Sequence, residues 1–318
     1  MIRLPCLHAS GKWGYIDQVG RWVIEPVYDF ASSYARSNIA SVVIGDNGRR
    51  TLVDIKGRNL FAPRPYQDLI ALDDGYAIAE TDSLVVINRL GEEIWSPQCE
   101  NLDAAGPGLF IEWLESWDRC RLVRMGGVPV IDKEFHELSV YAQKRVVLAR
   151  EETGYVLMDF GSNVLRSYSH IYDSLSPFDE RGRAVFSSQG MCGVISEDES
   201  LVLPPIFRSI DFCFGRDKTM VVCRDGEDGP FGVYDATNCD FVGGDFEYVA
   251  PATDENLFWG FNGSWSLYRK DGSCMAHDVC MELVHAVEGV YQGLVDGDGR
   301  MFYGFIGAKG LETVRCQI

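Results

Sequence analysis

Residues 11–29 decide the fold of this chain, and they read GKWGYIDQVGRWVIEPVYD. Two short apolar segments, Tyr15–Ile16 and Val23–Ile24, flank the glycine Gly20. Aromatic and β-branched residues favour strands, and a glycine between two such segments favours a tight turn with positive φ. Pro26 follows the second segment and favours a bend. The stretch therefore predicts a strand, a turn, a second strand and a bend.

The same pattern recurs along the chain with a period of about 36 residues. The position of Trp13 is held in later copies by Arg50, Leu84, Cys120, Tyr155, Cys192, Phe231, Trp265 and Tyr303. The turn position of Gly20 is held by Gly57, Gly91, Gly127, Ser162, Glu199, Asn238, Gly272 and Gly310. A core position eight residues after the turn holds Tyr28, Cys99, Phe135, Phe207, Phe246 and Cys280. The structural positions of the repeat therefore include Trp13, Gly14, Tyr28, Phe231, Trp265 and Tyr303.

This spacing predicts about nine copies in a single array over residues 1–318, with units that start near residues 11, 48, 82, 118, 153, 190, 229, 263 and 301. A third apolar segment, such as Ile39–Val43, makes each unit a three-stranded antiparallel meander. Such a unit cannot bury its apolar residues alone, so the units must stack. We expect an all-β protein. We favour an open superhelical, solenoid-like stack over a closed β-propeller-like ring, because propellers usually have about 4–8 four-stranded blades.

The first copy resembles the bacterial WG-repeat family, also called KWG. The residues that carry the resemblance are Lys12–Asp17, Gly20, Val23–Ile24, Pro26 and Tyr28–Asp29. Copies six, seven and nine keep partial matches in Cys192-Gly193, Phe231-Gly232 and Tyr303-Gly304. The resemblance implies an all-β, non-catalytic repeat protein whose relatives look like interaction modules.

The charge balance indicates which partners to expect. The chain has 47 acidic and 29 basic residues, so its formal net charge is −18. Such a field repels nucleic-acid phosphates and anionic lipid surfaces, and it attracts a basic protein. We therefore expect a protein partner, plausibly basic, with no nucleic acid and no membrane. The alternative is that the acidity serves solubility alone.

The sequence also predicts a compartment. The longest apolar runs, such as Leu84–Ile87, are far too short to span a bilayer. Residues 1–5 begin no long apolar stretch of the kind that a signal peptide needs. We expect a cytoplasmic protein whose ten cysteines are mostly thiols.

One segment has residue types that bind zinc. Cys274, His277, Cys280 and His285 lie within twelve residues of one another. Structural zinc sites use such ligands, but these four lack the Cys-x2-Cys spacing of a zinc knuckle. The repeat offers another explanation, because Cys280 takes the core position of Tyr28 and Cys274 takes that of Trp22. We favour the structural explanation and expect no metal.

Another segment departs from the repeat. Trp113, Glu115, Trp117 and Asp118 lie where neighbouring copies have a short hairpin link. Tryptophan is enriched in the energetic centres of interfaces, so these four residues are the candidate partner-binding site. The alternative is that both rings cover an end of the core.

No catalytic set is visible, and we predict neither catalytic residues nor a cofactor. The chain lacks a Gly-x-Ser-x-Gly elbow, and its five histidines share no repeat position. We predict a non-enzymatic protein–protein binding protein. One concrete form is an immunity or inhibitor protein that neutralises a basic bacterial toxin. Two alternatives stay open, namely an enzyme or small-ligand protein with a central channel, and a metal-dependent sensor.

Overall fold

The computed structural model describes the chain apart from residues 1–2, 9, 18–20, 46, 115–116, 169–170, 180, 215–219, 225–229, 253–255, 281, 288–289, 295–300, 308–309 and 316–318. Side chains are not described for residues 212–220, 224 and 282–315. The described residues form 34 strands and no α-helix, which confirms the all-β prediction. The chain divides into unit 1, residues 1–170, and unit 2, residues 171–318.

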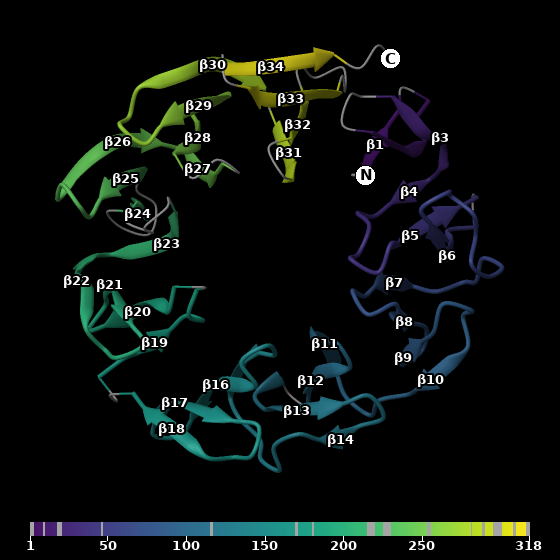
Figure 1. Cartoon of the computed structure of the whole chain (residues 1–318), viewed down its shortest axis with the longest axis horizontal. Coiled ribbons are helices and arrows are strands. Elements are labelled where there is room, and N and C mark those ends of the chain that lie inside the picture. The colour runs from purple at the N-terminus through teal and green to yellow at the C-terminus, as the bar shows by residue number, and fades with distance from the viewer. Residues whose placement is uncertain are drawn as a thin grey trace. The chain divides into compact units, whose positions relative to one another are not determined.

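Unit 1 contains five antiparallel sheets, coloured from purple to teal in Figure 1. Two sheets have three strands, namely β1 (Leu4–Leu7), β2 (Trp13–Ile16) and β3 (Trp22–Tyr28), then β4 (Phe30–Ala31), β5 (Ile39–Ile44) and β6 (Arg49–Asp54). Three sheets have four strands, namely β7 (Asp68–Ala71), β8 (Ala77–Glu80), β9 (Leu84–Ile87) and β10 (Glu93–Trp95), then β11 (Asn101–Gly106), β12 (Leu109–Trp113), β13 (Cys120–Arg124) and β14 (Val128–Pro129), then β15 (Glu137–Tyr141), β16 (Val146–Glu151), β17 (Gly154–Asp159) and β18 (Val164–Ser167).

Unit 2 contains four sheets of four strands each. They are β19 (Ser174–Leu175), β20 (Arg183–Ser188), β21 (Met191–Ser196) and β22 (Leu201–Phe207); β23 (Ser209–Phe214), β24 (Met220–Arg224), β25 (Phe231–Asp235) and β26 (Asp240–Phe246); β27 (Tyr248–Pro251), β28 (Leu257–Phe261), β29 (Trp265–Arg269) and β30 (Cys274–Cys280); and β31 (Glu282–Val287), β32 (Val290–Leu294), β33 (Met301–Gly307) and β34 (Gly310–Arg315).

The tandem meander is confirmed, but seven of the nine described sheets have one strand more than we predicted. The additional strand is the stretch that follows the Tyr28 position, such as β15. Its apolar pattern is weak, yet it pairs along its whole length with β16 and so satisfies its backbone hydrogen bonds. None of the described sheets closes on itself, which is consistent with the open stack that we favoured.

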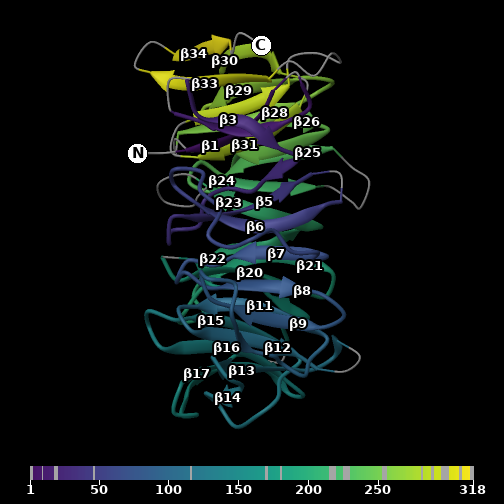
Figure 2. The same cartoon turned by 90° about the vertical axis from the view of Figure 1, so that its right-hand side faces the viewer.

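Successive sheets within a unit share hydrophobic cores, as the repeat requires. In unit 1, Tyr15 of β2 and Tyr28 of β3 pack with Val42 of β5 and Val53 of β6. Figure 2 shows the sheets of unit 1 lying one above another. In unit 2, Val194 of β21 packs with residues of β24 and β25 in the same way. Each sheet therefore buries its apolar faces against its neighbours.

The strand register confirms the predicted repeat positions. Trp13 pairs with Tyr28, and the equivalent pairs are Cys120 with Phe135, Cys192 with Phe207, Phe231 with Phe246 and Trp265 with Cys280. Gly57, Gly91, Gly127, Ser162, Glu199 and Gly272 have φ between 65° and 83°, as their turn position requires. In the seventh copy the positive φ falls on Cys239 rather than on Asn238, so that prediction was wrong by one residue. Tyr303 lies in β33, and its side chain is not among those that the structure describes.

The glycine of the Trp-Gly pair allows two strands to approach closely. A Cβ atom on Gly14 would lie 2.5 Å from the Ile24 carbonyl oxygen and 2.8 Å from the Trp22 ring. A Cβ on Gly193, the equivalent residue in the sixth copy, would lie 2.6 Å from the Leu203 oxygen. The pairing register shifts at both places, which is typical of a β-bulge. The glycine is thus a requirement of packing.

Candidate functional site

The hairpin between β12 and β13 carries the two tryptophans of the candidate partner-binding site. Trp113 ends β12 and packs against the core between the fourth and fifth sheets, and its Nε1 donates a 2.7 Å hydrogen bond to Asp103 Oδ2. Trp117 stacks on Trp113 with 6.2 Å between ring centroids and an interplanar angle of 27°. The Trp117 side chain is 55% exposed. The Trp113 indole therefore belongs to the core, while the Trp117 indole stacks on it with one face and is exposed to solvent.

Another residue of the predicted site, Asp118, lies in the same hairpin. Asp118 is exposed, and its carbonyl oxygen lies 3.2 Å from His136 Nδ1. Glu115 lies outside the described residues. Trp117 has a φ of 58°, a left-handed conformation that bulky residues seldom adopt. The left-handed backbone at Trp117 thus occurs at the residue whose ring is exposed to solvent.

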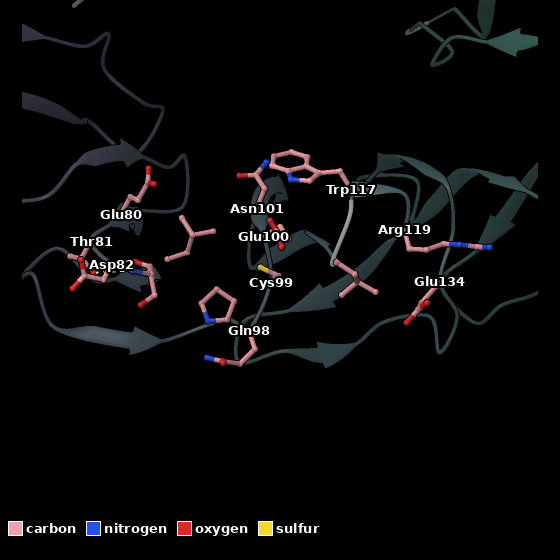
Figure 3. Close-up of a pocket in the computed structure, with 14 residues that line it drawn as sticks. Glu80, Thr81, Asp82, Gln98, Cys99, Glu100, Asn101, Trp117, Arg119 and Glu134 are labelled. Atoms are coloured by element: carbon pink, nitrogen blue, oxygen red, sulfur yellow. Dashed lines mark hydrogen bonds between the residues drawn. The ribbon is translucent and has the colours of Figure 1, made fainter.

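A hollow of about 1050 Å³ lies beside Trp117, entirely within unit 1 (Figure 3). We call it the acidic hollow. Its lining residues come from the β8–β9 hairpin, the β10–β11 connection, the β12–β13 hairpin and the segment after β14, and they are Glu80, Thr81, Asp82, Ser83, Leu84, Pro97, Gln98, Cys99, Glu100, Asn101, Leu114, Trp117, Arg119 and Glu134. The hollow thus joins residues of three successive repeat copies.

The charges of the hollow are strongly unbalanced. Four carboxylates, those of Glu80, Asp82, Glu100 and Glu134, line it together with one guanidinium, that of Arg119. Within the described part of the chain, no ion pair joins Glu80, Asp82 or Glu100 to a cation. Unpaired carboxylates around one concavity create a negative potential that favours a cationic ligand.

Arg119 is largely occupied by a carboxylate outside the hollow. Its Nη2 lies 2.6 Å from Glu152 Oε1, and His136 Nε2 approaches the same oxygen at 3.3 Å. The hydrogen bond from Arg119 and then that from His136 hold the pKa of Glu152 below its usual range. Arg119 therefore does little to neutralise the carboxylates of the hollow.

The hollow contains one thiol, that of Cys99, and this thiol is unreactive. Burial, and then the charge of Glu112, raise the pKa of the Cys99 thiol to about 11, so this thiol stays protonated at neutral pH. Glu112 is only 2% exposed and forms a 2.7 Å ion pair with Arg121 Nε. The arrangement can bind cations and aromatic-stacking groups, whereas its one thiol is a poor nucleophile.

The structure separates the two cysteines of the metal hypothesis. Cys274 and Cys280 stand at opposite ends of β30, which by strand rise is roughly 20 Å for six residues. Cys274 Sγ donates to the Leu267 carbonyl oxygen at 3.6 Å, and Cys280 is buried opposite Trp265. His277 is exposed, and the side chain of His285 lies outside the description. Among the described residues, no group of three or more histidine, cysteine or acidic side chains could hold a metal ion.

Sequence reasoning identified the tryptophans but missed the acids around them. Glu80, Asp82, Glu100 and Glu134 come from separate segments, and each alone resembles an ordinary solvated turn residue. Their positions within the repeat would have predicted that these acids lie close together. Glu80 ends β8, Asp82 lies in the tip of the following hairpin, and Glu100 follows the core position held by Cys99, so the stacking of copies brings them to one side.

Comparison with protein families finds one match. Residues 13–47 match the family model described as WG containing repeat. The match includes the Trp13-Gly14 pair and supports a WG-type repeat in the first copy. No curated protein matches the sequence.

Comparison with solved structures supports the fold. The chain is similar to a structure titled as the eukaryotic initiation factor, with 11% identity and a TM-score of 0.55 over 86% of each chain. It is also similar to BamB from Moraxella catarrhalis, with 11% identity and a TM-score of 0.45 over 88% of this chain and 92% of that one. These neighbours are β-propeller-like proteins. With 11% identity and a TM-score above 0.5, the similarity to the initiation factor shows the fold alone.

The described strands and loops include no helix that is long and apolar enough to cross a membrane.

Proposed function

We propose that the chain is a non-enzymatic protein-binding repeat protein whose acidic hollow receives a basic segment of a partner protein. One observation carries the proposal, namely that four carboxylates and the exposed Trp117 ring face one concavity with a single, already occupied arginine. Repeat proteins commonly bind partners through surfaces that several copies build together. The hollow is such a surface, because three copies contribute to it.

The net charge of −18 supports the same proposal. A negative protein attracts a basic partner over the Debye length, about 8 Å at physiological ionic strength, and this raises the association rate. The stacked tryptophans would then supply apolar contact area at the centre of the contact. We further propose a cytoplasmic location and a partner that is neither nucleic acid nor membrane. Neutralisation of a basic toxin, as by an immunity protein, is the concrete form that we favour.

The proposal is tested by capture from the source cell at low ionic strength. The immobilised chain should retain a basic protein, and the double variant Glu80→Lys/Glu100→Lys should lose it. The double variant Glu25→Lys/Glu92→Lys is the matched control, because both residues are exposed in the same unit and neither lines the hollow. A partner retained equally by all three proteins would show that the hollow is not the binding site.

The toxin-neutralising form has its own test. The gene beside this one should encode a basic protein that slows growth when expressed alone, and co-expression of this chain should restore growth. Restoration by the Glu80→Lys/Glu100→Lys variant to the same extent would count against the role of the hollow.

A further inference from the structure

One position of the repeat places an acid beside the tip of the next hairpin. It is the residue directly after the core position that Tyr28 holds in the first copy. Its backbone N–H donates to a carbonyl oxygen near the end of the second strand in the following sheet. Asp29 donates to Val43 O at 2.8 Å, and Glu100 donates to Trp113 O at 2.9 Å. Asp29 and Glu100 are therefore equivalent, and the side chain of Glu100 starts next to the Trp113–Trp117 pair.

In the first copy this acid is neutralised from within the chain. Lys12, the residue before Trp13, places its Nζ 2.5 Å from Asp29 Oδ1. The other carboxylate oxygen accepts a 2.6 Å hydrogen bond from the Gly45 N–H at the tip of the next hairpin. The Lys12 hydrogen bond holds the pKa of Asp29 below its usual range.

In the third copy the cation is missing. The residue before Leu84, which takes the place of Trp13, is Ser83, and it stands where the first copy has Lys12. Ser83 and Glu100 both line the acidic hollow. Glu100 thus holds the repeat position of Asp29, while a short hydroxyl side chain stands where the first copy has its lysine.

We propose that an arginine side chain of the partner occupies this vacated position, pairing with Glu100 and stacking on the free face of Trp117. This deepens the proposed function, on which it rests, by naming the group that the hollow recognises. Arginine suits the position better than lysine does, because a guanidinium is planar, stacks on an indole and can donate to two carboxylate oxygens at once. Glu80 and Asp82 would face neighbouring basic groups of the same segment.

The test returns the missing lysine to the chain. Ser83→Lys should pair internally with Glu100, as Lys12 does with Asp29, and should therefore compete with the partner's cation. The probe is a synthetic Gly-Ser peptide that contains arginines, compared with otherwise identical peptides that contain lysine or the uncharged analogue citrulline. Binding is measured by calorimetry at low ionic strength with the full chain.

We expect the arginine peptide to bind the wild-type chain most tightly, and Ser83→Lys to weaken it about tenfold, the effect of roughly 1.4 kcal/mol. Ser83→Gln, which is neutral and comparably long, should bind almost as well as the wild type. Glu25→Gln raises the net charge by one unit, as Ser83→Lys does, but outside the hollow, so it measures how much of any loss reflects net charge alone.

The outcomes separate the two proposals. If Ser83→Lys and Ser83→Gln bind alike while Glu80→Lys/Glu100→Lys loses binding, the hollow is a site but the vacated-lysine inference is wrong. Equal affinity for the lysine and arginine peptides would overturn the assignment of arginine. Failure of the wild-type chain to bind any of the charged peptides would overturn both the inference and the proposed use of the hollow.

Discussion

The hairpins that follow β1 and β12 occupy equivalent places in the repeat, yet they use tryptophan in opposite ways. Trp13 of the first copy is partly buried and packs into the core of its sheets, and its ring centroid lies 5.8 Å from that of Phe30. In the fourth copy Cys120 fills that position and is fully buried. The tryptophans there are Trp113, which ends β12 and packs against the core, and Trp117, which lies in the hairpin and is 55% exposed. The same stacked scaffold can thus hold an aromatic ring for stability or present it for contact.

The residue after each of these positions differs as well. Gly14 lets the β3 backbone and the Trp22 ring approach closely. Arg121, its equivalent, sends its side chain to the buried carboxylate of Glu112. At this position the strands of the first copy are held together by close packing. In the fourth copy the strands are joined by the Arg121–Glu112 ion pair, and the neighbouring hairpin lines the acidic hollow.

The largest effect should come from closing the space above Gly14. Gly14→Ala places a methyl group 2.5 Å from the Ile24 oxygen, where a rigid strand backbone must move. We expect the free energy of unfolding of unit 1 to fall by about 3 kcal/mol, as for severe overpacking. Chemical denaturation followed by tryptophan fluorescence measures it.

Gly244→Ala is the matched control for this substitution. No atom lies within 4 Å of a Cβ built on Gly244, and the residue does not have a positive φ. Its stability should change by less than about 0.5 kcal/mol, as for exposed sites in general. Equal losses in both variants would show that Gly14 has no special packing role.

The two tryptophans should separate stability from binding. Trp13→Ala removes a ring that packs into a core, so it should destabilise unit 1 by about 2 kcal/mol, less than a fully buried ring would. Trp117→Ala should change stability by less than about 1 kcal/mol, because its ring is mostly exposed. It should nevertheless weaken binding of the arginine peptide roughly threefold to thirtyfold, the range of a cation–π contact.

Denaturation and calorimetry on the same two variants provide the check. The distinction between the hairpins fails if Trp117→Ala costs as much stability as Trp13→Ala, since Trp117 would then be a core residue after all.

The sequence allowed the repeat, its turns and its cores to be predicted because each depends on local chemistry. The turn position demands positive φ, and even Ser162 and Glu199 comply. A further signal was present but unused. Asp17, Asp54 and Asp159 each accept a backbone N–H from the residue four positions later, which closes the turn.

The remaining features depend on contacts between copies, which no single copy encodes. β15 was missed because only its pairing with β16 makes it a strand. The acidic hollow was missed for a similar reason, since Glu80, Glu100 and Glu134 meet only when three copies stack. The choice between an open stack and a ring stays a prediction.

The smallest effect should come from making the first copy resemble the third. Lys12→Ser removes the cation from Asp29, and because the two side chains are partly exposed and screened by solvent, the loss of stability at neutral pH should be less than about 1 kcal/mol. The pKa of Asp29 is lowered in the folded state, so the pair stabilises the fold above the unfolded-state pKa of about 3.9 and loses this contribution as pH falls through the lowered value. In Lys12→Ser the carboxyl pKa of Asp29 should rise toward its ordinary value, which an NMR titration detects. An unchanged pKa would mean that the Gly45 N–H, rather than Lys12, sets the charge of this position, and the parallel between Lys12 and the cation missing beside Glu100 would no longer hold.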